Sequence, residues 1–136
     1  MKTIEVVAAI IIYDEKILCM QRAQGKHEYV SCKYEFPGGK IELGESHVNA
    51  LMRELKEEMN IEVIIVEDDH YLTVNHEYPD FSITMYSYIC RVATENFVRK
   101  EHINHVWLPT EQLHELDWAQ ADIPIVNKLQ GANMLE

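Results

Sequence analysis

One segment, from Gly39 to Ile61, constrains the fold of this chain more than any other. It reads GKIELGESHVNALMRELKEEMNI, in which apolar residues recur at helical spacing and glutamates fill neighbouring positions. On a helix that turns about 100° per residue, Glu54, Glu57 and Glu58 fall within one arc of roughly 100°. Carboxylates crowded in this way repel one another unless a cation lies among them. The segment therefore predicts either a solvated acidic face, the commoner case for such runs, or a metal site beside a buried stripe.

The residues around these glutamates favour the metal site. A double glycine precedes the helix, and the Arg53-Glu54 pair follows Glu45 by eight residues. Ser46 is suited to cap the start of the helix. Asn60 is suited to its end, because asparagine tolerates a left-handed backbone better than most residues. Few unrelated chains meet all of these conditions together.

This pattern resembles the Nudix box, in which a glycine and a glutamate are followed by R-E-aliphatic-x-E-E-x-G-aliphatic at fixed spacing. Every position but one is matched, and the exception is Asn60, where the family has glycine. The stretches YEFPGGKIELGE and WLPTEQL also resemble Nudix hydrolases of the MutT type, so the likeness covers nearly the whole chain. The resemblance implies an α/β/α sandwich with a mixed β-sheet, and hydrolysis of a phosphoric anhydride in a nucleotide.

Length and composition limit the number of domains, the size of the core and the kind of partner. The chain of 136 residues fits one domain, 1–136, and 47% of its residues are hydrophobic, enough for one sizeable core. A formal net charge of −11 argues against a nucleic-acid polymer as partner, because binding its phosphates needs a basic surface. A small free nucleotide remains possible, since divalent cations can bridge carboxylates to phosphates. The first apolar run is too short to cross a membrane, so we expect a cytoplasmic protein, either a monomer or a homodimer.

The remaining pattern predicts a mixed α/β order. Strands are expected at 4–13, 17–22, 62–70, 71–78, 81–92 and 106–108, and helices at 46–60, after Thr110 as a cap, and from Ile123 onward. A polar loop over a site is expected at 23–34, and a turn at Gly38-Gly39. The three cysteines, Cys19, Cys32 and Cys90, lack the spacing of a disulfide framework or a zinc site.

The resemblance also implies a metal site. It assigns the metal to Glu54, Glu58 and the backbone carbonyl of Gly38, with Glu57 close by and Glu101 as a further glutamate near the metal. The expected ion is Mg²⁺, with Mn²⁺ as a possible substitute, because a hard divalent ion takes carboxylates, waters and phosphate oxygens together. As a lone residue, Glu101 is read equally well as a solvated side chain.

Proton transfer needs a base beside the metal. We take Glu57 as the first candidate for the base and Glu54 as the next, because a carboxylate beside a metal-bound water needs little pKa adjustment. In the family, the arginine at the position of Arg53 orients a catalytic glutamate. Its alternative role is a surface ion pair worth about 0–1 kcal/mol.

Six residues outside the acidic run are candidates for substrate contact: Arg22, His27, Phe36, Lys40, Phe81 and Asp122. Arg22 and Lys40 suit phosphate, and His27 is either a phosphate contact or an ordinary loop side chain. The two phenylalanines stack on a base or belong to the core. Asp122 reads either as a helix cap or as a residue that hydrogen-bonds the nucleobase. An ionised Asp122 accepts hydrogen bonds only, which favours the amino group of cytosine or the N–H groups of an oxidised guanine.

The function that follows is Mg²⁺-dependent hydrolysis of a nucleoside triphosphate to the monophosphate and pyrophosphate. The resemblance to the CTP pyrophosphohydrolase branch suggests CTP or dCTP, or an oxidised purine such as 8-oxo-dGTP. One alternative is a hydrolase of another nucleoside diphosphate derivative such as ADP-ribose, for which only Pro79 offers a match. The other is a non-catalytic, nucleotide-sensing Nudix domain, which is expected to lose box glutamates that this chain retains.

Overall fold

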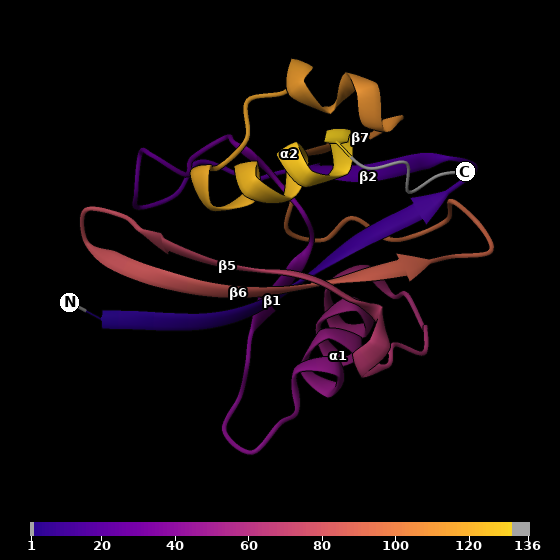
Figure 1. Ribbon diagram of the computed structural model, residues 1–136, viewed down its shortest axis with the longest axis horizontal. Helices are drawn as coiled ribbons and strands as arrows, with labels where there is room; N and C mark the ends of the chain where they lie inside the picture. The colour runs from indigo at the N-terminus through magenta and orange to yellow at the C-terminus, as the bar shows by residue number, and fades with distance from the viewer. Residues whose placement is uncertain (1, 132–136) are drawn as a thin grey trace.

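Strand β1 (Lys2–Tyr13) is the centre of the fold seen in a computed structural model, which describes residues 2–131. The strands that follow are β2 (Lys16–Gln21), β3 (Tyr34–Glu35), β4 (Gly38–Lys40), β5 (His70–Glu77), β6 (Phe81–Arg91) and β7 (Asn104–Leu108). The helices are α1 (His47–Met59) and α2 (Ile123–Gly131), with short 3-10 helices η1 (Glu67–Asp69), η2 (Thr110–Glu115) and η3 (Gln120–Asp122). Figure 1 shows α1 on one face of the sheet and α2 on the other, which confirms the predicted sandwich.

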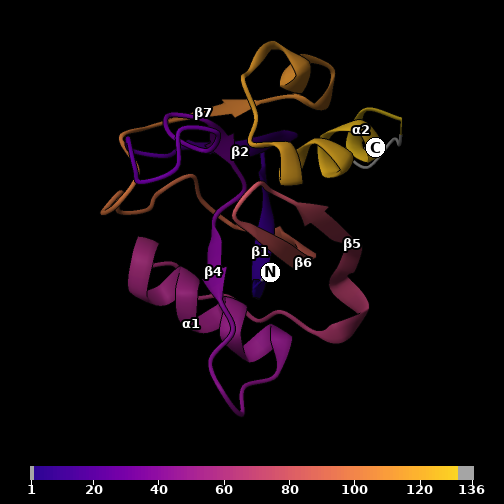
Figure 2. The same ribbon diagram turned by 90° about the vertical axis from the view of Figure 1, so that its left-hand side faces the viewer.

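The sheet is mixed, as predicted. Its main order is β3-β2-β1-β6-β5, with β4 also paired to β1 and β7 to β2. Strands β1 and β6 run parallel from Lys2↔Phe81 to Ile12↔Arg91, whereas the other pairs are antiparallel. A parallel pair needs a long connection, and here α1 and β5 lie within it (Figure 2).

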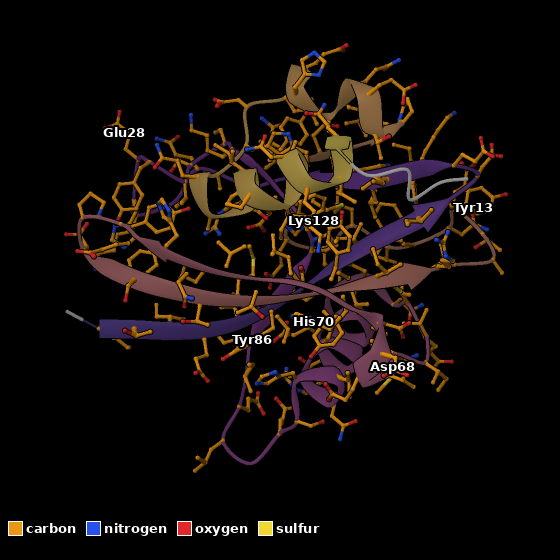
Figure 3. The ribbon with its side chains drawn as sticks, viewed as in Figure 1. Tyr13, Glu28, Asp68, His70, Tyr86 and Lys128 are labelled. Atoms are coloured by element: carbon orange, nitrogen blue, oxygen red, sulfur yellow. The ribbon has the colours of Figure 1, made fainter. Side chains whose placement is uncertain are left out.

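Two hydrophobic clusters lie on opposite faces of β1. Ala8, Ile10 and Ile12 belong to the cluster that packs under α2, whereas Val7, Ala9 and Ile11 belong to the cluster that packs on α1. This explains why β1 is apolar at successive positions, since a strand covered on both faces does not alternate. Figure 3 shows the same division among the labelled side chains: Lys128 lies on the α2 side, and His70 and Tyr86 lie on the α1 side.

Helix α1 begins and ends as the sequence predicts. The Ser46 hydroxyl accepts a hydrogen bond from the Asn49 amide at 3.2 Å, and Asn60 ends the helix with φ of 55°. The buried residues of α1 are Ala50, Leu51, Leu55 and Met59. Because the apolar stripe fixes the rotation of the helix, Glu54 is turned toward β4, where its carboxylate lies against Gly39.

Three local predictions are wrong. Residues 62–66 form no strand, because no strand in the described part of the chain pairs with them, and η1 occupies 67–69. Gly38 and Gly39 lie in strand β4 rather than in a turn, where they pair with Ala8 and Val7. The short helix after β7 begins from Pro109 with no capping side chain, so Thr110 is not its cap.

Candidate active site

An acidic cluster forms where α1 faces the loop that precedes β7. Glu54 lies in α1 with its side chain 12% exposed, and Glu58 is half-buried one turn later. Burial, followed by a hydrogen bond and charge repulsion from Glu101, raises the pKa of Glu58 to about 7. Burial also raises the pKa of Glu54, although Arg53 opposes this change. The fold thus brings Glu101, which lies far from the box in sequence, to the carboxylates of α1.

Arg53 holds the other side of this cluster. Its guanidinium donates to both oxygens of Glu45 at 2.7 and 2.9 Å, to Glu54 at 3.0 Å and to Glu57 at 3.1 Å. It also donates to the Lys40 carbonyl at 3.1 Å. These bonds raise the pKa of Arg53 and lower that of Glu45. The contacts show that Glu45 braces the loop before the helix and that Arg53 contacts two candidate catalytic carboxylates at once.

The double glycine allows β4 to pass between β1 and this cluster. A Cβ atom at Gly38 would overlap the backbone carbonyl of Val7, and one at Gly39 would overlap the carboxylate of Glu54. At Gly38 the obstacle is backbone, so a side chain would require β1 or β4 to move, whereas at Gly39 it would displace the Glu54 carboxylate. The backbone of β4 therefore lies directly against Glu54.

The cluster suits a hard divalent cation. Burial and neighbouring carboxylates raise the pKa values of Glu54 and Glu58. A cation bound among these carboxylates would oppose this change, so the site favours positive charge. Within residues 2–131, no three His, Cys, Asp or Glu side chains converge closely enough to hold a metal by themselves. Carboxylate oxygens are the donors that a hard divalent ion prefers, and such an ion can take its other ligands from water, backbone or phosphate. The residues predicted to contact it are Gly38, Glu54, Glu57, Glu58 and Glu101.

Glu57, the first candidate for the base, lies at the rim of the cluster. Its side chain is 60% exposed and pairs with Arg53 at 3.1 Å. Glu54, the second candidate, is more enclosed and lies beside Gly39. Water can reach Glu57 directly, which is compatible with the role predicted for it.

A cavity of about 660 Å³ opens on the other side of β4. All six residues selected from the sequence as substrate contacts line it: Arg22, His27, Phe36, Lys40, Phe81 and Asp122. Gly38 and Gly39 line it as well, so the cavity and the acidic cluster share one strand as a wall. The volume is in the range of small-molecule sites.

The walls of the cavity are formed by contacts between distant segments. Phe36 is buried and stacks on Trp118 with ring centroids 4.8 Å apart. The loop between β2 and β3 closes one side, because His27 contacts the Asp80 carboxylate at 3.4 Å and its ring lies 5.5 Å from that of Phe81. Phe36 is thus part of the core with one edge at the cavity, whereas Phe81 is only partly buried and better placed for stacking.

Asp122 lies at the closed end of the cavity with 4% of its surface exposed. Its carboxylate accepts a hydrogen bond from the Phe36 amide at 3.2 Å, which ties η3 to the chain after β3. Burial, with a smaller contribution from Glu35, raises the pKa of Asp122 well above its usual range. This shift opposes the ionised form considered from the sequence, and a protonated carboxyl group can donate a hydrogen bond as well as accept one.

Two residues of the site were missed in the sequence. Glu35 lines the cavity and accepts from Arg22 at 3.1 Å and from His102 at 2.9 Å. Nothing in the local pattern marks either residue, since Glu35 lies in a two-residue strand and His102 lies in a loop. In the sequence, His102 could have been selected because it directly follows Glu101. Arg22, which was expected to contact phosphate, has Glu35 as its partner in this structure.

Comparisons with known proteins agree with this architecture. The NUDIX domain family matches residues 3–129. CTP pyrophosphohydrolase from Escherichia coli (strain K12) is 38% identical over 136 residues, which cover 93% of this chain and 90% of that protein. 8-oxo-dGTP diphosphatase from the same strain is 31% identical over 134 residues, with 96% and 98% covered. The crystal structure of MutT protein from Methanosarcina mazei Go1 has a TM-score of 0.84 at 21% identity, with 98% and 96% covered, which confirms the fold.

Proposed function

Because this chain belongs to the NUDIX domain family, we propose that it hydrolyses nucleoside triphosphates to the monophosphate and pyrophosphate with Mg²⁺ as cofactor. Mn²⁺ is expected to substitute. The substrate is a free nucleotide of the cytoplasm, and pyrimidine or oxidised purine triphosphates are preferred. The names of the relatives, a CTP pyrophosphohydrolase and an 8-oxo-dGTP diphosphatase, support this substrate class.

One observation carries the proposal: the cavity and the acidic cluster meet at β4. Gly38 and Gly39 line the cavity, and Gly39 lies directly against Glu54. A nucleotide with its base in the cavity therefore reaches the carboxylates of α1 with its phosphates. Neither half of the site suffices alone, because the cavity contains none of the carboxylates proposed to hold the metal and the acidic cluster alone repels phosphate.

The residues then take separate tasks. Glu54, Glu58, Glu101 and the Gly38 carbonyl would hold the metal, which when bound would supply the positive charge that neutralises the phosphates. Glu57 accepts a proton from the attacking water, and general-base catalysis of this kind contributes about 10²–10⁴ in rate. Arg53 keeps Glu57 in place through the bond of 3.1 Å.

Lys40 and Arg22 provide positive charge where the phosphates pass. Lys40 is exposed at the end of β4, and Arg22 lies at the mouth of the cavity with its side chain 43% exposed. Phe81 is the candidate for stacking on the base. Asp122, as a neutral acid, offers the base one donor and one acceptor.

The test is a panel of canonical, methylated and oxidised nucleoside triphosphates, each assayed with Mg²⁺, with Mn²⁺ and with a chelator. We expect pyrophosphate as product, loss of activity in the chelator, and the highest kcat/KM for a cytidine or oxidised guanosine triphosphate. Glu54→Gln serves as the matched inactive control, because it keeps the shape of the side chain and removes its charge. Release of orthophosphate alone, or full activity in the chelator, would contradict the proposal.

A further inference from the structure

We propose that His102 is a positioning residue that couples the nucleobase cavity to Glu101, so that the identity of the base affects kcat as well as binding. The inference rests on the proposed function. Its basis is the placement of one carboxylate, Glu35, which lines the cavity and is bound from both sides.

Glu35 has one partner on each of its oxygens. Arg22 donates to Oε1 at 3.1 Å, and Nε2 of His102 lies 2.9 Å from Oε2. Because a carboxylate only accepts hydrogen bonds, Nε2 must carry the hydrogen. A base that donates to Glu35 shares an oxygen with Arg22 or His102, and so changes the geometry and strength of one of these two hydrogen bonds. Binding in the cavity therefore changes the hydrogen bond between Glu35 and His102.

His102 transmits such a change because it is closely packed. Its side chain is 12% exposed, and it follows Glu101 directly in the chain. A shift of the His102 ring moves the adjoining backbone, and with it the Glu101 carboxylate that contacts Glu58. The side chains of Glu35 and His102, and the peptide bond between His102 and Glu101, thus connect the base to the acidic cluster.

The other anchors of this loop make no contact with the cavity lining. Lys100 donates to the Glu57 carbonyl at 2.9 Å, and the Val98 amide donates to the Met59 carbonyl at 2.9 Å. These bonds attach the loop to the last turn of α1, where a cation is favoured. Lys100 and His102 thus support Glu101 from opposite sides, and of the two only His102 is bonded to a residue of the cavity. This provides a matched pair for an experiment.

The experiment compares His102→Leu, His102→Gln and Lys100→Met with the wild type. For the best-hydrolysed base, His102→Leu should lower kcat about tenfold, the usual effect of losing one charge-assisted hydrogen bond. For the poorest base it should lower kcat much less, because that base does not engage Glu35. His102→Gln keeps a donor and should restore much of the difference. Lys100→Met should lower kcat by a similar factor for every base.

A second readout uses no metal and no turnover. With a chelator present, CMP or 8-oxo-dGMP is added to labelled full-length protein and the amide resonances of Ala121 and Glu101 are followed. Ala121 lines the cavity and reports binding. Both resonances should shift in the wild type and in Lys100→Met, whereas in His102→Leu that of Ala121 should shift and that of Glu101 should not.

The outcomes separate this inference from the proposed function. If the wild type hydrolyses no nucleoside triphosphate, the proposed function fails. If it does, but His102→Leu lowers kcat equally for all bases, or the Glu101 resonance still follows binding in that variant, the coupling is refuted while the function stands.

Discussion

Replacing Glu101 by glutamine should stabilise the metal-free protein above pH 7. In the wild type, burial and then the Glu101 carboxyl group raise the pKa of Glu58 from the ordinary 4.5 to about 7. The folded protein therefore keeps a proton on Glu58 at pH values where the unfolded chain has released it. Because the folded state binds more protons between pH 4.5 and 7, its free energy of unfolding falls as the pH rises through this window.

The size of the effect follows from the pKa difference. The rise to about 7 corresponds to a loss of about 3 kcal/mol above pH 7, since each pKa unit is about 1.36 kcal/mol. Burial is the largest cause and remains in the variant, and solvent screens a half-buried pair, so we assign about 1 kcal/mol to Glu101. Glu101→Gln should thus gain about 1 kcal/mol at pH 8 and almost nothing at pH 5.

The assay is urea unfolding in a chelator at pH 5 and pH 8. Glu28→Gln is the matched control, because it removes the same charge from an exposed side chain that extends into solvent (Figure 3). A carbon-detected NMR titration should show the pKa of Glu58 falling in Glu101→Gln. If the variant is no more stable at pH 8 than Glu28→Gln, Glu101 does not repel Glu58 and the acidic cluster is not as described. Stabilisation by added Mg²⁺ should be smaller in the variant, since one ligand is lost.

Three further changes test other parts of the site. Gly38→Ala should cost about 1–3 kcal/mol of unfolding free energy by overpacking against the Val7 carbonyl; urea midpoints within error of the wild type would show that β4 moves freely. Glu57→Gln should lower kcat at least about 100-fold with an unchanged thermal midpoint, and a near-normal rate would remove Glu57 from the base role. Asp122→Ala should reorder kcat/KM across the nucleotide panel, whereas Asp122→Asn, which keeps a donor and an acceptor, should preserve the order. If the order of kcat/KM is the same in both variants and the wild type, Asp122 has only a structural role.

The helical parts of the fold were predictable because their signals are local. Ser46 and Asn60 mark the two ends of α1 through capping chemistry that depends on a few neighbouring residues. Residues 62–66 were wrongly predicted as a strand because β-branched composition favours a strand but is not sufficient for one. A strand also needs a partner, and whether one is available is decided by the whole sheet.

Some residues of the candidate site were likewise predictable from the sequence, and others were not. The common face of Glu54, Glu57 and Glu58 follows from helix geometry. Of the six cavity residues, Arg22, His27 and Asp122 were found through the resemblance to a family, whereas Lys40 and the two phenylalanines were selected by their chemistry. The raised pKa of Asp122 was not predictable, since it depends on burial that only the folded chain produces. Glu35 and His102 were not predicted as site residues for the same reason, because their hydrogen bond of 2.9 Å joins residues 67 positions apart.

The unfavourable electrostatics of the acidic cluster and its proposed function have one cause. A half-buried Glu58 with a pKa of about 7 is partly protonated at neutral pH, so a metal ion must displace a proton to bind it. Metal affinity should therefore rise with pH up to about 7 and level off above it. Under the proposed function, a bound cation would recover the free energy that the fold loses by crowding these carboxylates, and the phosphates of the nucleotide would complete its coordination. In this way the same repulsion that weakens the metal-free protein favours binding of metal and substrate together.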